Sequence, residues 1–186
     1  MKSTIDAKNV LSGVQAVVFD LDGTLYDKRG LAKRMVRRLW WCLPLMLTDR
    51  LAKGRVWHWI VSTRWHRKVY LKTMTELIEK HCPRREEVIE LAQTAHRMGL
   101  KTAIYSDYGA VEEKLEALKV DTENFDLLIT APELGGLKPS KECAMQVLER
   151  LGANPETTLF VGDRDEKDGA AARSVGAKFL WVNGEW

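Results

Sequence analysis

Two aspartates, Asp20 and Asp22, stand two positions apart at the end of a short apolar run and directly before Gly23 and Thr24. Side chains two positions apart in an extended chain point to the same face, so both carboxylates can serve one site. Two neighbouring carboxylates can divide the work of a nucleophile and of a general acid and base. The pair therefore indicates an active site.

Further polar residues follow later apolar runs in the same way: Ser106 and Asp107, Lys138, Asp163 and Asp168. Carboxylates gathered at one edge of a sheet repel one another unless a cation lies among them, and ligands that are all oxygen favour a hard ion such as Mg²⁺. Gly23 lets a backbone N–H approach an anion, while Ser106 and Lys138 offer a hydroxyl and a positive charge to phosphate oxygens. The sequence predicts a divalent metal and an anionic, oxygen-rich substrate.

The elements that must position these residues follow from the hydrophobic pattern. Five short apolar runs are typical of buried parallel strands, at 16–20, 102–106, 126–130, 158–162 and 178–182. Helical patterns lie between them at 84–98, 111–118 and 140–151. This alternation predicts an α/β fold with a doubly wound, Rossmann-like parallel sheet of about five strands, covered by helices on both faces. Ligands of such sheets bind beyond the carboxyl ends of the strands, where the polar residues fall.

The motif Asp-x-Asp-Gly-Thr at Asp20, Ser106 after the second strand, Lys138 after the third, and Gly-Asp-x-x-x-x-Asp ending at Asp168 occur in one order. Together they resemble the haloacid dehalogenase superfamily, in its phosphatase branch. The resemblance implies a hydrolase in which Asp20 attacks phosphorus to give an aspartyl-phosphate. Asp22 would protonate the leaving oxygen and then activate water. Members that displace halide from carbon lack this second aspartate, so dehalogenation is disfavoured.

The same resemblance implies a place for the metal and for the phosphoryl group. Asp20, the backbone carbonyl of Asp22, and Asp163 would bind Mg²⁺. Asp168 would anchor Lys138 or metal-bound water. The expected contacts to the phosphoryl group are the hydroxyl of Ser106, the N–H groups near Gly23 and Thr24, the ammonium of Lys138, and Asp107, which stands where many relatives have Asn.

Residues 27–83 interrupt the alternation and are predicted to form a small helical cap inserted after the first strand, with 1–26 and 84–186 as the catalytic core. Between Lys28 and Lys72 there are 13 Lys and Arg residues but one acid, Asp49, and five of the seven tryptophans lie between Trp40 and Trp65. Helices are expected over 31–43 and over a second stretch that begins near Thr48 or Asp49 and runs toward Tyr70. In the resembling family, an insertion here closes over the active site and selects the substrate.

The basic, tryptophan-rich cap leaves three interpretations open. Its tryptophans can pack the cap while its charges face solvent, it can lie on an anionic membrane and present a lipid-linked phosphate, or it can bind nucleic acid, which the sequence favours least. Two alternatives to a phosphatase are a phosphomutase acting on a sugar phosphate and a binding module without activity. Three cysteines without paired spacing, together with an N-terminus that lacks a signal-peptide pattern, predict a cytoplasmic protein, with contact at the membrane surface as the alternative.

Overall fold

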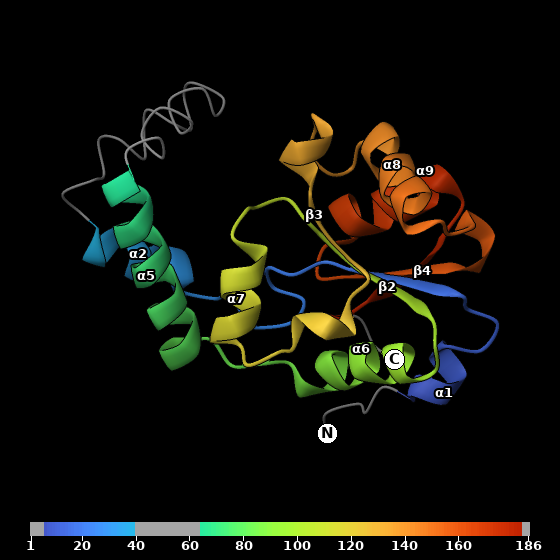
Figure 1. Cartoon of the computed structure of the whole chain (residues 1–186), viewed down its shortest axis with the longest axis horizontal. Helices are drawn as coiled ribbons and strands as arrows, with labels where there is room; N and C mark the ends of the chain where they lie inside the picture. The colour runs from blue at the N-terminus through green and yellow to red at the C-terminus, as the bar shows by residue number, and fades with distance from the viewer. Residues whose placement is uncertain (1–5, 40–63, 184–186) are drawn as a thin grey trace. The chain divides into compact units, whose positions relative to one another are not determined.

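The computed structural model describes residues 6–39 and 64–183, with the side chains of 64–67 left aside (Figure 1). The chain divides into two compact units, one made of Met1–Asp27 and Arg84–Trp186 and the other of Lys28–Pro83. No helix among the described residues is long and apolar enough to cross a membrane.

The first unit is built on a five-stranded sheet in which every pair of neighbours is parallel. Its order is β3-β2-β1-β4-β5, with bounds β1 Ala16–Phe19, β2 Lys101–Ser106, β3 Leu127–Thr130, β4 Thr158–Gly162 and β5 Lys178–Trp181. The chain winds outward from β1 through β2 to β3 and then returns to the other side of β1. The direction of winding therefore reverses between β1 and β4, which is where ligands of doubly wound sheets bind. The predicted fold class is confirmed.

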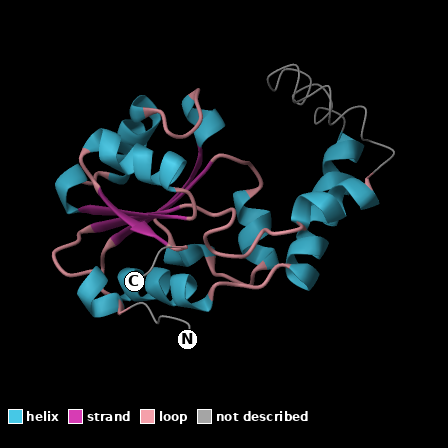
Figure 2. Ribbon diagram, turned by 180° about the vertical axis from the view of Figure 1, so that it is seen from behind, coloured by secondary structure: helices cyan, strands magenta, loops and turns pink. Residues whose placement is uncertain are grey.

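Helices cover both faces of this sheet. Figures 1 and 2 show α8 and α9 on one face and α1 and α6 on the other. The helices of the first unit are α1 Ala7–Val10, α6 Glu86–Arg97, α7 Val111–Ala117, α8 Lys141–Leu151 and α9 Ala170–Val175. Short 3₁₀ turns occupy Thr122–Asn124, Ala131–Leu134 and Pro155–Thr157, and a π-helical turn spans Asp165–Gly169.

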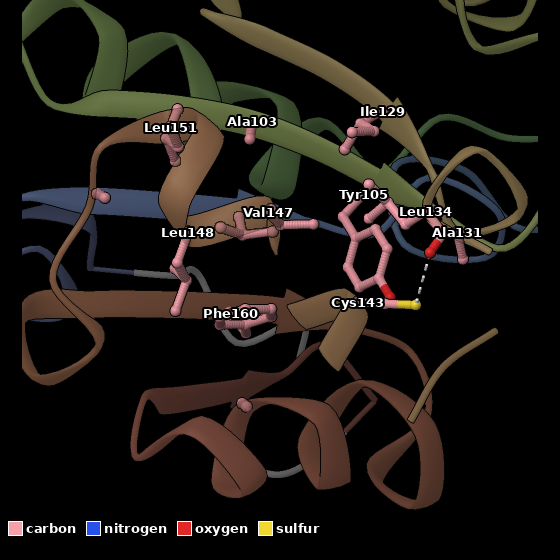
Figure 3. Packing of buried hydrophobic residues seen from close by; sticks show 13 residues of the cluster. Ala103, Tyr105, Ile129, Ala131, Leu134, Cys143, Val147, Leu148, Leu151 and Phe160 are labelled. Carbon is pink, nitrogen blue, oxygen red and sulfur yellow. Dashed lines mark hydrogen bonds between the residues drawn. The ribbon is translucent and has the colours of Figure 1, made fainter. Parts of the chain in front are cut away.

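The sequence explains why these elements form. All four residues of β1 are buried, as expected for a central strand covered on both sides. In α8 the Ser140 hydroxyl caps the first turn by accepting from the Cys143 N–H, and Gly152 ends the helix with a φ of 62°. The apolar face of α8 packs on the sheet (Figure 3) in a core that includes Val18, Ala103, Tyr105, Val147, Leu148 and Phe160.

The second unit contains α2 Leu31–Arg38 and α5 Arg64–His81. Arg38 donates to Glu76 across the two helices at 2.9 Å. The predicted first helix ends earlier than expected, at Arg38, and the rest of that prediction lies outside the described residues. Helix α5 overlaps the end of the second predicted helix and continues past Tyr70 to His81. The predicted start of that helix lies outside the described residues, as do four of the five clustered tryptophans.

The two ends of this insertion leave the first unit side by side. Tyr26 and Arg84 form an isolated antiparallel bridge. Next to it, the Arg85 N–H donates to the Leu25 carbonyl at 2.8 Å. The chain therefore enters and leaves the insertion at one place in the first unit.

Candidate active site

Asp20 directly follows β1, and its backbone N–H donates to the Val161 carbonyl of β4 at 2.8 Å. Its carboxylate is buried and accepts two hydrogen bonds, from Lys138 Nζ to Oδ1 at 2.7 Å and from the Thr24 hydroxyl to Oδ2 at 2.9 Å. Burial raises the pKa of Asp20 from 3.8 to about 6, because desolvation outweighs the attraction of the Lys138 ammonium. A carboxylate with little hydration is suited to nucleophilic attack.

Asp22 lies in different surroundings, although it is two residues away. Its Oδ1 accepts from the Tyr26 hydroxyl. Its Oδ2 accepts from the Ser106 hydroxyl at 3.1 Å and from Lys114 Nζ at 2.8 Å. Asp20 and Asp22 thus have separate hydrogen-bond partners, which allows the two carboxylates to perform different chemical tasks.

Lys138 links the two sides of the site. Its ammonium donates to Asp20 Oδ1 and to Asp168 Oδ1, at 2.7 and 2.8 Å, and lies 4.7 Å from the centre of the Tyr105 ring. The two carboxylates raise the pKa of Lys138 despite its burial, so the side chain stays charged. Asp168 also accepts from the Arg164 N–H through Oδ2, at 3.1 Å. With Asp20 and Asp168 ionised, this triad carries a net negative charge.

Carboxylate oxygens of Asp20, Asp163 and Asp168 lie within 4.8 Å of one another. This set of hard oxygen donors, in a place where negative charge exceeds positive, fits a divalent ion such as Mg²⁺. The backbone carbonyl of Asp163 accepts from Trp181 Nε1 and from Asn183 Nδ2, both at 3.0 Å. The C-terminal end of β5 therefore holds the loop that carries Asp163.

Three residues expected at the phosphoryl group have other partners in this structure. The Thr24 N–H donates to the Leu21 carbonyl at 3.3 Å. The Ser106 hydroxyl donates to Asp22 Oδ2 at 3.1 Å. The carboxylate of Asp107 accepts from the Lys138 N–H at 2.9 Å and from Lys167 Nζ at 2.9 Å. Asp107 therefore holds the loop of Lys138 and pairs with Lys167, while its predicted contact to the phosphoryl group stays a prediction.

Sequence reasoning missed several partners of these residues. Lys114, Tyr26 and Lys167 each bind a predicted site carboxylate, and Tyr105 lies under Lys138. Of these residues, only Lys114 could have been recognised from the sequence. It falls on the helix face of Val111, Leu115 and Leu118, where an apolar residue would be expected.

Comparison with protein families matches residues 14–176 to a model described as haloacid dehalogenase-like hydrolase. The chain is also similar to curated proteins named pyrophosphatase PpaX. That of Halalkalibacterium halodurans is 28% identical over 184 residues, covering 89% of this chain and 81% of the relative. That of Bacillus cereus strain B4264 is 29% identical over 187 residues, covering 91% and 83%.

Solved structures share the fold. A HAD phosphatase from Thermococcus onnurineus superposes with a TM-score of 0.65 at 22% identity, covering 93% of this chain and 89% of the other. A 2-haloacid dehalogenase from Pseudomonas syringae pv. Tomato superposes with a TM-score of 0.64 at 18% identity, with the same coverage. One of these proteins is named a phosphatase and the other a dehalogenase, so the fold does not choose the reaction and the side chains must.

Proposed function

The chain belongs to the haloacid dehalogenase-like hydrolase family, and within it we propose a Mg²⁺-dependent phosphatase that cleaves a phosphate monoester through an aspartyl-phosphate on Asp20. The observation that carries the proposal is the difference between the two aspartates. Asp20 is buried against Lys138 beside two further carboxylates, whereas Asp22 is held by separate donors. This is the division of roles that a covalent phosphatase needs.

The metal would be held by Asp20, Asp163 and the backbone carbonyl of Asp22. Bound there, Mg²⁺ would offset the negative charge of the phosphoryl oxygens. Lys138 supplies a second positive charge, kept in place by Asp168 and by the bond from its own N–H to Asp107. The Ser106 hydroxyl turns from Asp22 to a phosphoryl oxygen when substrate enters.

The reaction has two steps that balance in atoms and protons. First, with Asp22 protonated before the step, a carboxylate oxygen of Asp20 forms a bond to phosphorus while the ester P–O bond breaks, and Asp22 gives its proton to the departing alcohol. Second, water attacks the same phosphorus and loses a proton to Asp22 while the bond to Asp20 breaks. Inorganic phosphate leaves, and both side chains return to their starting states.

The proposed substrates are phosphate esters of alcohols. Inorganic pyrophosphate is a further candidate substrate, because the similar curated proteins are named pyrophosphatases. It contains a phosphoanhydride in place of an ester, but the same two steps would cleave it. A lipid-linked phosphate remains the candidate that the basic insertion suggests.

The test measures Mg²⁺-dependent phosphate release from sugar phosphates, nucleotides, pyrophosphate and short-chain lipid phosphates, with Asp20→Asn as control. We expect turnover that needs Mg²⁺ and falls by several orders of magnitude in the variant. Phosphoryl transfer to a second sugar position without release of phosphate would favour a mutase. A folded protein that binds Mg²⁺ but turns over no member of the panel would contradict the proposal.

A further inference from the structure

Lys114 is a buried charge that takes no part in the two proposed steps of phosphate cleavage. It lies in α7 with its side chain 3% exposed, and its ammonium is 2.8 Å from Asp22 Oδ2, on a side chain that is 12% exposed. Burying an ammonium is costly unless a partner repays the lost hydration. An apolar residue at this position of α7 would pack without that cost, so the presence of a buried ammonium here indicates a function other than packing.

The geometry around Asp22 supplies one. Its carboxylate is held by Tyr26 on Oδ1 and by Ser106 and Lys114 on Oδ2. These three donors come from the loop after β1, the end of β2, and α7. A carboxylate bonded from three separate elements has little freedom to rotate.

The bond from Ser106 cannot persist through the proposed reaction. A serine hydroxyl has one proton to donate, and Ser106 is expected to give it to the phosphoryl group. Once it turns, Tyr26 and Lys114 remain on Asp22. Lys114 is the one of these two donors that carries a charge, and a charged donor 2.8 Å from Asp22 Oδ2 makes the stronger hydrogen bond.

The backbone before α7 is consistent with a functional demand at this place. Ala110 precedes the helix with a φ of 61°, in the left-handed region that non-glycine residues rarely occupy. The turn at Ala110 joins the end of β2, which carries Ser106, to the helix that carries Lys114. Strained residues of this kind concentrate at functional sites, where the surrounding structure holds them.

We propose that Lys114 is a positioning residue that holds Asp22 where it exchanges protons with the leaving group and with water. The inference rests on the proposed phosphatase reaction and adds to it a residue outside the motifs. It predicts that loss of Lys114 harms proton transfer more than it harms binding of substrate or attack by Asp20.

The test compares two esters that differ in their need for a proton. The p-nitrophenolate ion leaves without much help, whereas a simple alkoxide must be protonated as it departs. In Lys114→Met, we expect kcat/KM for an alkyl phosphate to fall by ~10²-fold or more, the usual contribution of general acid catalysis. For p-nitrophenyl phosphate we expect a loss of roughly tenfold or less. Lys178→Met, at an exposed position at the start of β5, should lower neither value.

Lys114→Gln accompanies this variant because it keeps a donor without the charge, and it serves as the test if Lys114→Met fails to fold. Its losses should lie between those of wild type and Lys114→Met, with the same dependence on the leaving group. Equal losses on both esters would show a merely structural role, and unchanged kcat/KM would show no role, so either result overturns the inference. A wild-type protein that hydrolyses neither ester would instead remove the proposed function, and this inference with it.

Discussion

Asp20 and Asp22 show how surroundings divide one residue type into two roles. Asp20 lies at the end of the central strand, is desolvated, and is bonded to a charged lysine and a hydroxyl. Asp22 is partly exposed and bonded to three donors. The first arrangement suits a nucleophile, and the second suits a group that gives and accepts a proton.

The raised pKa of Asp20 predicts how metal-free stability depends on pH. Its pKa is about 6 when folded against an ordinary 3.8, so the folded state binds the proton more tightly than the unfolded state. The stability gained from that proton is fully present below about pH 4 and is lost as pH rises through about 6. The asparagine of Asp20→Asn cannot ionise, so this variant does not lose that stability. Relative to wild type, we expect its free energy of unfolding to rise by roughly 3 kcal/mol as pH increases over this range, at about 1.4 kcal/mol per pKa unit.

Urea unfolding of both proteins in EDTA, at several pH values from 4 to 7.5, measures this difference. Asp165→Asn is the matched control, because the hydrogen bond from Arg173 lowers the pKa of that exposed aspartate below 3.8, so the difference in free energy of unfolding between this variant and wild type should stay nearly constant over this pH range. If the free energy of unfolding of Asp20→Asn instead falls relative to that of wild type as pH rises, burial is not the dominant cause of the pKa shift.

At the scale of elements, the site depends on loops that are packed tightly at the carboxyl ends of β1 and β4. Gly162 ends β4 against the side chain of Asp168, where an added Cβ would lie 2.3 Å from Asp168 Cβ. Real Cβ atoms essentially never approach so closely, so the π-helical turn that carries Asp168 can lie here only because residue 162 has no side chain.

Gly162→Ala should therefore displace Asp168 from Lys138. We expect a loss of ~1–3 kcal/mol in the free energy of unfolding, as for other overpacked sites, together with a large fall in kcat. Gly109→Ala is the control, since an added Cβ there meets nothing within 4 Å. Thermal unfolding and phosphate release measure both effects. Equal behaviour of the two alanine variants would show that the contact with Asp168 does not constrain the site.

The elements of the first unit could be predicted because buried parallel strands are short apolar runs bounded by polar residues. The predicted strand 158–162 matches β4, and the other four differ at their ends by one residue. The motif residues could be placed because each follows a strand. Their partners could not, since Lys114 reaches Asp22 across 92 positions and Lys167 reaches Asp107 across 60. Such contacts depend on tertiary packing that no local pattern records.

At the scale of the whole molecule, chemistry and selectivity can reside in different units. The candidate site residues all belong to the unit formed by Met1–Asp27 and Arg84–Trp186. The insertion carries a basic helix, α2, with exposed Lys33, Arg37 and Arg38. We propose that this unit governs which phosphate reaches the site, as expected for a cap.

The bridge between Tyr26 and Arg84 predicts that the first unit folds without the insertion. Replacing Lys28–Pro83 by a short Gly and Ser linker should leave cooperative thermal unfolding and a rise in Tm on addition of Mg²⁺, because ligands that bind the folded state stabilise it. Discrimination among phosphate esters should fall. Asp163→Asn in the same shortened chain should lose the Mg²⁺ response. A shortened chain that does not unfold cooperatively would contradict the prediction.

The central claim is that Asp20 becomes phosphorylated, and trapping that ester tests it most directly. Asp22→Asn removes the base of the second step, and with p-nitrophenyl phosphate the first step needs little acid, so the phosphorylated protein should accumulate. Acid quenching and peptide mass spectrometry locate the phosphoryl group. We predict that it lies on Asp20 and is absent from the Asp20→Asn protein. A phosphoryl group on another residue, or none in a protein that releases p-nitrophenol and phosphate, would contradict the account.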